Sequence, residues 1–219
     1  MTKAYVFAAG PLLWVSVIVF AAGCLLRLGR LAWLARKKDR PVYAYMSAHY
    51  ALRSIGRWLV PMGTESMRKH PVTTVVSFAF HAAVVLVPLF LFAHVLLFYE
   101  AFGISWWTLP EEAAYAGTLV VLAGLVYFFA RRLIRPEVRY LSGPADFALL
   151  VLVALPFATG LWAFHHGPGV RVVMLLHVLS GEALLAAIPF TKLSHMFLFP
   201  FLRGYMGSEF GSVRHARDW

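Results

Sequence analysis

The sequence predicts an all-α integral membrane protein with five transmembrane helices. Hydrophobic residues make up 61% of the 219 residues and charged residues only 14%, and the mean hydropathy is +0.72. A hydrocarbon core about 30 Å thick needs about 20 consecutive apolar residues per helix. Five windows of that kind contain few charges. The sequence shows no internal repeat and no second domain. We therefore expect residues 1–219 to form a single membrane domain.

The apolar windows are expected to form the spans in chain order. The first is too long for a secretory signal peptide, and Arg27 and Arg30 follow it, so we expect an uncleaved helix. The longest connection, 27–70, contains YAYMSAHYALRSIGRWLVP, which favours a short helix that lies at the membrane surface or docks a partner. Residues 196–219 are expected to form a cytoplasmic tail. The expected spans are 5–26, 72–98, 114–130, 145–164 and 172–191.

Basic residues predict the orientation of these helices. Eighteen of the twenty Lys and Arg residues lie in 27–70, 131–139 and 192–217, and only Lys3 and Arg171 remain for the other side. Because cytoplasmic loops are enriched in Lys and Arg, we expect the N-terminus outside and the loop 27–70 and the C-terminus in the cytoplasm. The net charge of +10 is then explained by topology and membrane lipid, and it does not indicate nucleic acid as a partner. The single cysteine, Cys24, excludes a disulfide or an iron–sulfur cluster built by this chain alone.

Four histidines lie within or at the edge of two of the windows. His177 and His195 are 18 residues apart, which is five helical turns, so on one helix they share a face about 27 Å apart. His81 and His94 lie about 20 Å apart on the antiparallel second helix. Neutral imidazoles opposed across a helix bundle are what a b-type haem requires as axial ligands. We predict two haems b, one held by His81 with His195 on the cytoplasmic side and one by His94 with His177 on the external side.

An alternative pairing remains open for the second helix. Thirteen residues on a straight helix place His81 and His94 about 140° apart, although Pro88 between them can kink the segment. His70 and His81 share a face, which would give the pairs His70 with His195 and His81 with His177. His70 lies beside Arg68 and Lys69, however, where lipid headgroups are expected.

Other charged residues are candidates for secondary roles. Glu182 in the fifth window and Glu100 after the second could relay protons or contact a quinone, although a local hydrogen bond or an ordinary helix end would also explain them. A basic cluster could reach the propionates of a cytoplasmic haem, although topology alone would account for it. This cluster is Arg131, Arg132 and Arg135.

Several segments resemble a known family. IPFTKLSHMFLFP (188–200) resembles the fifth-helix signature Pro-Phe-Ser/Thr-Lys/Arg-Leu-x-His of the cytochrome b, or gamma, subunit of respiratory nitrate reductases. In this resemblance His195 takes the place of the haem ligand that ends the motif, and His177 that of the upstream ligand. FAFHAAVVLVPLFLFAH (78–94) is similar to the second-helix ligand segment, and RRLIRPEVRYLSGPAD (131–146) to the basic hinge before the fourth helix.

The external turn is more similar to a related branch. YEAFGISWWTLPEE (99–112) resembles the cytochrome b subunits of transmembrane redox complexes of sulfate-reducing bacteria, which are related to membrane-bound heterodisulfide reductase. The second-helix spacing and the longer first loop also depart from the nitrate reductase pattern. This branch implies a dihaem subunit in the bacterial inner membrane, with a cytoplasmic iron–sulfur subunit and a periplasmic multihaem cytochrome c as partners.

We expect the protein to carry electrons across the membrane between a periplasmic cytochrome c, or menaquinol, and the iron–sulfur subunit, without catalysing a reaction alone. The acidic turn with Glu111 and Glu112 favours docking of a basic cytochrome c over a quinol site. The competing hypothesis is a haem-free membrane anchor or transporter subunit whose histidines shuttle protons or bind a metal. The absence of an internal repeat weighs against a transporter, and ligands at two depths weigh against zinc.

Overall fold

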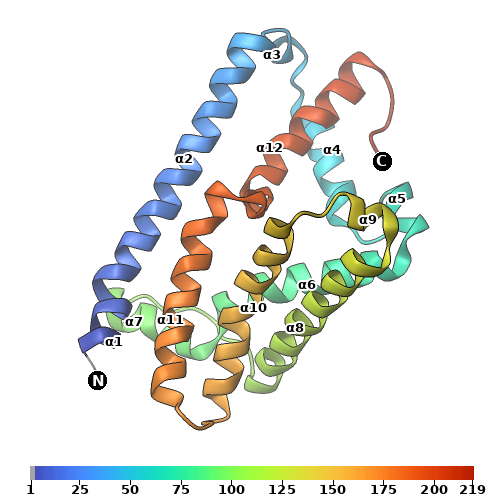
Figure 1. Ribbon diagram of the computed structural model, residues 1–219. Coiled ribbons are helices and arrows are strands. Elements are labelled where there is room, and N and C mark those ends of the chain that lie inside the picture. The colour runs from blue at the N-terminus through green and yellow to red at the C-terminus, as the bar shows by residue number, and fades with distance from the viewer. Residues whose placement is uncertain (1–2) are drawn as a thin grey trace. The chain divides into compact units, whose positions relative to one another are not determined.

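The computed structural model describes residues 3–219 and is built from helices (Figure 1). Among these residues, five helices are long and apolar enough to cross a membrane. This confirms the predicted all-helical class and the predicted number of spans. The five helices are Lys3–Lys38, Pro71–Phe90, Glu111–Ile134, Pro144–Phe164 and Val170–Phe190.

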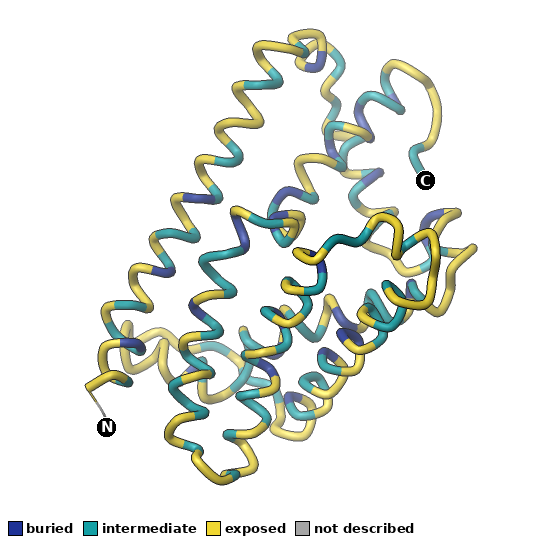
Figure 2. Tube along the Cα trace, in the orientation of Figure 1, coloured by how far each residue is buried: buried dark blue, intermediate teal, exposed yellow. Residues whose placement is uncertain are grey.

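The long helices expose much of their apolar surface. In Figure 2, exposed residues recur along their lengths. Leu25 and Leu26 are 71% and 72% exposed, and Val126 is 69% exposed. Soluble proteins rarely expose apolar patches of this extent, whereas lipid tails favour them. These surfaces are suited to contact with lipid.

The chain, which we expected to form one domain, groups into two compact units that are each described separately. The first unit joins Val75–Gly181 to the beginning of the chain as far as Ala9. The second unit comprises Gly10–Thr74 and Glu182–Trp219.

The first unit contains most of the membrane-length helices. Its elements are α1 (Lys3–Phe7), the start of the π-helical turn η1 (Ala8–Leu12), most of α6 (Pro71–Phe90), α7 (Phe92–Phe102), α8 (Glu111–Ile134), α9 (Pro136–Tyr140), α10 (Pro144–Phe164) and the first two thirds of α11 (Val170–Ala187).

Glycines on α8 allow α6 to approach closely. A Cβ at Gly124 would lie 3.0 Å from Cδ2 of Phe80, and a Cβ at Gly117 would lie 2.6 Å from Cγ2 of Val87. The two glycines are seven residues apart and so lie on one face of α8. Small residues at such positions are typical of helix packing in membranes, where close backbone approach supplies the van der Waals contact.

The second predicted span is interrupted. We expected one helix over 72–98, but α6 ends at Phe90, Leu91 adopts an extended conformation (φ −68°, ψ 128°) and α7 begins at Phe92. Pro88 lacks an N–H group, and its ring displaces the carbonyl of the preceding turn. The proline identified in the sequence therefore lies three residues before a complete break.

The second unit contains the rest of the first helix. It also contains the segments 27–70 and 196–219, which we predicted to be a cytoplasmic loop and tail. Its elements are α2 (Leu13–Lys38), α3 (Val42–Tyr45), α4 (Ala48–Leu59), α5 (Glu65–Lys69), the 3-10 turns η2 (Ile188–Phe190) and η3 (Lys192–Ser194), α12 (His195–Ser208) and the π-helical turn η4 (Glu209–Val213).

The predicted loop and tail pack against each other as helices. The first helix continues to Lys38 instead of ending near residue 26. The short helix expected within 27–70 is present as α4, and it packs along α12, in the segment expected to be a tail (Figure 1). Ser47 N–H donates to Ser208 Oγ at 3.1 Å, and that hydroxyl donates back to Ser47 O at 3.2 Å. The partner that α4 docks is thus its own chain.

The fifth predicted helix is also interrupted before its second histidine. Helix α11 ends at Ala187, Thr191 is extended (φ −120°, ψ −175°), and α12 begins at His195. Pro189 cannot continue the helical hydrogen bonds, and the Thr191 side chain accepts from Leu193 N–H at 3.3 Å to start a new turn. The prediction that His177 and His195 share a face of one continuous helix is therefore wrong.

Candidate functional site

The structure brings together one of the two predicted histidine pairs. His94 lies on α7 and His177 on α11, both within the first unit. Their ring centroids are 6.1 Å apart and their planes are inclined by only 24°. His81 lies on α6 in the first unit and His195 at the start of α12 in the second, so each of these two is described with its own neighbours.

The break at Leu91 determines where His94 lies. A helix that stops leaves its last carbonyl groups without N–H partners, and these must be satisfied inside a membrane. His94 Nδ1 lies 2.8 Å from Pro88 O. Trp106 Nε1 donates to Leu89 O at 2.8 Å, and Leu109 N–H donates to Phe90 O at 2.8 Å. One predicted ligand therefore caps the helix that precedes it.

His177 is held by a polar notch on α10. Its Nδ1 lies 2.9 Å from Pro156 O and 3.3 Å from Thr159 Oγ1. Gly160 provides the space, since a Cβ there would lie 3.1 Å from His177 Cε1. The sequence analysis missed these three residues. A proline, a threonine and a glycine within five residues of an otherwise apolar helix were the available signal.

All four predicted ligands share one feature of their hydrogen bonding. Besides the two bonds above, Nδ1 of His81 lies 2.7 Å from Ser77 O and Nδ1 of His195 lies 2.8 Å from Lys192 O. A carbonyl oxygen can only accept, so Nδ1 carries the proton and the neutral ring keeps its lone pair on Nε2. Histidines that bind metals usually have this arrangement, because the second nitrogen is fixed by a carbonyl or carboxylate.

His70, the alternative ligand, differs from these four. It is exposed, and it takes part in the structure through its backbone, whose N–H donates to Met67 O at 3.3 Å at the end of α5. Within the described residues its ring makes no hydrogen bond. This contrast favours His94 over His70 as the residue prepared for ligation.

The His94–His177 geometry fits two axial ligands of one iron. Imidazoles bound through a nitrogen at about 2 Å on opposite sides of a metal place their ring centres roughly 6 Å apart. The observed 6.1 Å agrees with this separation. Within residues 3–219, no three His, Cys, Asp or Glu side chains converge as a metal site. A haem needs only two side-chain ligands, so it remains compatible with this arrangement.

The acidic candidates have unlike surroundings. Glu182 is buried, and neither of its carboxylate oxygens has a hydrogen-bond partner within residues 3–219. Glu100 is exposed on α7. Glu111 and Glu112 are exposed in the first turn of α8, where the helix dipole favours negative charge.

The basic cluster lies at the end of α8. Arg132 Nη1 donates to Phe128 O of its own helix at 3.1 Å, Arg131 lies in the same last turn, and Arg135 ends the helix. This arrangement caps the helix and complements its dipole, so the structure supplies a local reason for these residues.

No protein-family model matches the chain. A comparison with curated proteins finds a relative in Nitratidesulfovibrio vulgaris (strain Hildenborough), named simply "Protein". The two chains are 39% identical over 217 residues, which cover 96% of this chain and 95% of the relative. The chain belongs to the same family as that protein.

Proposed function

We propose that this protein, as a member of that family, is a dihaem b membrane subunit of a respiratory redox complex. The observation that carries the proposal is the His94–His177 pair, with rings 6.1 Å apart and each Nδ1 anchored to a backbone carbonyl. The resemblance of 188–200 to nitrate reductase gamma subunits, and of 99–112 to heterodisulfide-reductase-like complexes, supports the same assignment.

The protein's own groups position the ligands. The bonds to Pro88 O and Pro156 O fix the rings in the tautomer that presents Nε2, and they increase the basicity of that nitrogen. Rotation of the His94 ring would remove the donor to Pro88 O, which costs about 1–3 kcal/mol, whereas Pro156 O also accepts from Thr159 Oγ1 at 3.2 Å. A bound haem would supply an iron centre that takes up and releases one electron.

The second haem is assigned to His81 and His195. Support comes from their Nδ1 bonds to Ser77 O and Lys192 O. As in His94 and His177, these bonds leave Nε2 of each ring available to bind a metal. Among residues 3–219, no such bond is made by the ring of His70, the alternative ligand. We keep His81 with His195 as the proposed cytoplasmic pair.

The proposed orientation places the N-terminus outside and the C-terminus in the cytoplasm of a bacterial cell membrane. The haem of His94 and His177 then lies toward the outside, where a periplasmic multihaem cytochrome c would dock at Glu111 and Glu112. The cytoplasmic haem would exchange electrons with an iron–sulfur subunit. Menaquinol is the competing electron donor, and Glu100 and Glu182 are the candidate groups that would accept its protons.

Spectroscopy of the purified full-length protein tests the proposal. The reduced-minus-oxidised spectrum should show a b-type band, and a pyridine haemochrome assay should give about two haems per chain. A preparation without a b-type band would reject the proposal and leave the haem-free anchor or transporter.

Single substitutions test the pairing. His94→Ala and His177→Ala should each reduce the haem content from about two to about one per chain and remove the same spectral component. His81→Ala and His195→Ala should remove the other component, and His70→Ala serves as the matched control. Loss of a haem in His70→Ala, with both retained in His94→Ala, would shift the pairs to His70 with His195 and His81 with His177.

A further inference from the structure

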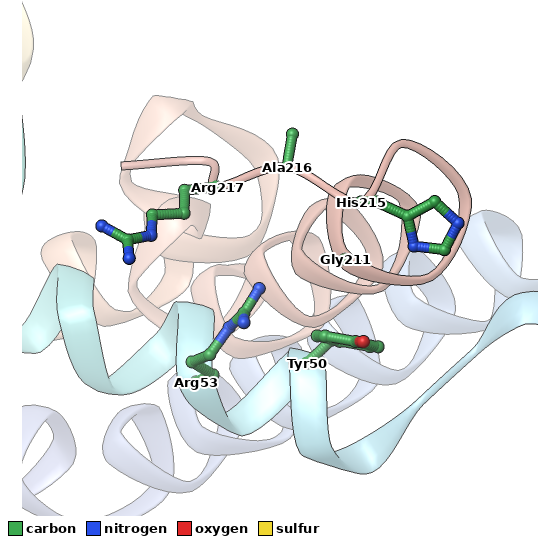
Figure 3. Close-up of a pocket in the computed structure, with 6 residues that line it drawn as sticks. All are labelled: Tyr50, Arg53, Gly211, His215, Ala216 and Arg217. Carbon is green, nitrogen blue, oxygen red and sulfur yellow. The ribbon is translucent and has the colours of Figure 1, made fainter.

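A basic pocket lies between α4 and the segment that follows η4 in the second unit (Figure 3). Its volume is about 210 Å³. Figure 3 shows Tyr50 and Arg53 on α4, and it shows Arg217 and His215 on the segment that follows η4. The lining residues are Tyr50, Arg53, Gly211, His215, Ala216 and Arg217.

Two aromatic rings hold Arg53 in place. Its guanidinium carbon lies 4.7 Å from the centroid of the Tyr50 ring and 4.8 Å from that of Trp219. Its Nε is buried without a hydrogen-bond partner. Within residues 3–219, none of the ion pairs includes Arg53. Aromatic rings stabilise the charge of a guanidinium, but they do not accept hydrogen bonds from its five N–H groups as an oxyanion would.

The acidic groups nearest in sequence are already engaged elsewhere. Asp218 accepts from Ser54 Oγ at 2.5 Å and pairs with Arg203 at 3.6 Å, and its side chain is only 2% exposed. Glu209 pairs with Arg214 at 2.5 Å. Neither carboxylate is therefore the counter-ion of Arg53, and Arg217 and His215 add only basic groups to the pocket.

The backbone is shaped to form this pocket. A Cβ at Gly211 would clash with the Tyr50 ring, so only glycine allows the ring to lie against η4. His215 has a left-handed conformation (φ 48°), and Ala216 N–H donates to Phe210 O at 2.9 Å. This turn reverses the chain and returns Trp219 to Arg53. Left-handed backbone at a residue other than glycine is uncommon and is kept only where the surroundings enforce it.

Size and chemistry select the ligand class. The pocket is smaller than the roughly 300–1,000 Å³ of sites for organic ligands, and an arginine fork matches the oxygens of a phosphate group. Helix α4 also exposes Leu52 and Leu59, at 68% and 60%. Basic groups beside exposed apolar side chains are typical of helices at a membrane surface.

We infer that this pocket binds the phosphate group of an anionic membrane phospholipid, with Arg53 and Arg217 as its ligands. None of the four predicted haem ligands lines the pocket, and the inference does not depend on haem. Inorganic phosphate shares the same chemistry, so the test must separate the two sources.

The test uses the full-length protein in detergent and native mass spectrometry of bound lipid. Phosphatidylglycerol should bind, and phosphatidylcholine should compete poorly. Arg53→Gln with Arg217→Gln should weaken phosphatidylglycerol binding at least about tenfold, because the charge-assisted hydrogen bonds to the phosphate are lost. Arg30→Gln, an exposed arginine on α2, is the matched control and should bind as the parent does.

A single variant and a measurement with inorganic phosphate distinguish the possible outcomes. Arg217→Gln alone, at an exposed position, should leave the fold intact and still weaken binding, which covers the case in which loss of Arg53 disturbs the packing of Trp219. Equal lipid binding by the parent and the double variant would overturn the inference. Binding of inorganic phosphate at millimolar concentration, with no binding of phosphatidylglycerol, would show that the ligand is free phosphate and would overturn the assignment to a lipid.

Discussion

Two helices carry the predicted haem ligands, and both are interrupted between their histidines, but the breaks are closed by different groups. Between α6 and α7, the last carbonyls accept from His94, Trp106 and Leu109. Between α11 and α12, Thr191 caps the next turn, and Arg27 of α2 donates to Pro189 O at 2.9 Å. Proline starts both interruptions, yet only the first is capped by a proposed ligand.

A break in a helix can orient a side chain when that side chain also satisfies the helix end. In the first break the bond that satisfies Pro88 O also orients the His94 ring, so the helix end and the ligand depend on each other. In the second, the groups that satisfy the backbone are not ligands, and His195 is oriented by Lys192 O within its own turn. Changes near the first break should therefore affect the proposed outer haem more than changes near the second break do.

The largest effect is expected from Gly160→Leu. Even a Cβ at this position would lie 3.1 Å from His177 Cε1, so a larger side chain must displace the ring from Pro156 O. The haem content should fall from about two to about one per chain in a haemochrome assay. Gly29→Leu on α2, where a Cβ would meet nothing within 4 Å, should keep both haems. Retention of both haems by Gly160→Leu would argue against the proposed outer pair.

Trp106→Phe is expected to weaken the first break. The substitution keeps the aromatic contact with Phe98 but leaves Leu89 O without its donor, which costs about 1–3 kcal/mol in the free energy of unfolding. Denaturant unfolding in detergent micelles, followed by circular dichroism, measures the change. Trp107→Phe is the matched control, because Trp107 is exposed and contacts only the ring of Phe90 among the interactions described, and it should change the value by less than about 0.5 kcal/mol.

Arg27→Gln should affect the second break and leave the first unchanged. Loss of the charged donor to Pro189 O is expected to destabilise the protein by about 1–2 kcal/mol. The spectral component assigned to His81 and His195 should shift, and that of His94 and His177 should not. Arg30→Gln provides the control. An equal shift of both components would show that the two breaks are not independent.

The smallest effect is expected at Tyr205, whose hydroxyl donates to Asp39 in the second unit, outside the membrane spans. This hydrogen bond, with a further one involving Tyr45 and burial, raises the pKa of Tyr205 well above 10. A raised pKa means that the contribution to stability is present below about pH 10 and is lost as the pH rises through the folded-state value.

Tyr205→Phe should therefore lower the free energy of unfolding by about 1 kcal/mol at neutral pH and reduce its decline above about pH 10. Unfolding curves recorded across that range measure both effects. Tyr140→Phe, at a residue 91% exposed, is the control. An unchanged alkaline decline in Tyr205→Phe would contradict the assignment.

Much of the architecture could be predicted from local patterns. Each apolar window became a helix of membrane length, since a run of about 20 apolar residues can satisfy its backbone in lipid only as a helix. The histidines could be singled out because polar groups are rare in such windows. The prediction that His94 and His177 form a pair needed only their positions along two antiparallel helices, and these follow from counting residues.

The bounds at Leu91 and Thr191 could not be predicted in this way. Pro88 and Pro189 indicate that the helices are interrupted. The residue at which each helix resumes depends on donors such as Trp106 and Arg27, which lie 17 and 162 residues from the carbonyls that they reach. The pairing of α4 with α12 was missed for a related reason. The contact joins residues as far apart as Ser47 and Ser208, 161 positions along the chain, and it depends on close packing of Gly207 against Ser54, which no local pattern indicates.

Hydropathy and helical spacing are sums over neighbouring residues, so the amino-acid sequence was sufficient to predict five apolar helices and to single out four histidines as candidate ligands. Which carbonyl holds each imidazole, and the contact of Arg53 with the rings of Tyr50 and Trp219, became known from the tertiary structure alone. Those outcomes depend on which buried polar groups meet in space, and a buried donor or acceptor must find its partner wherever the chain places one.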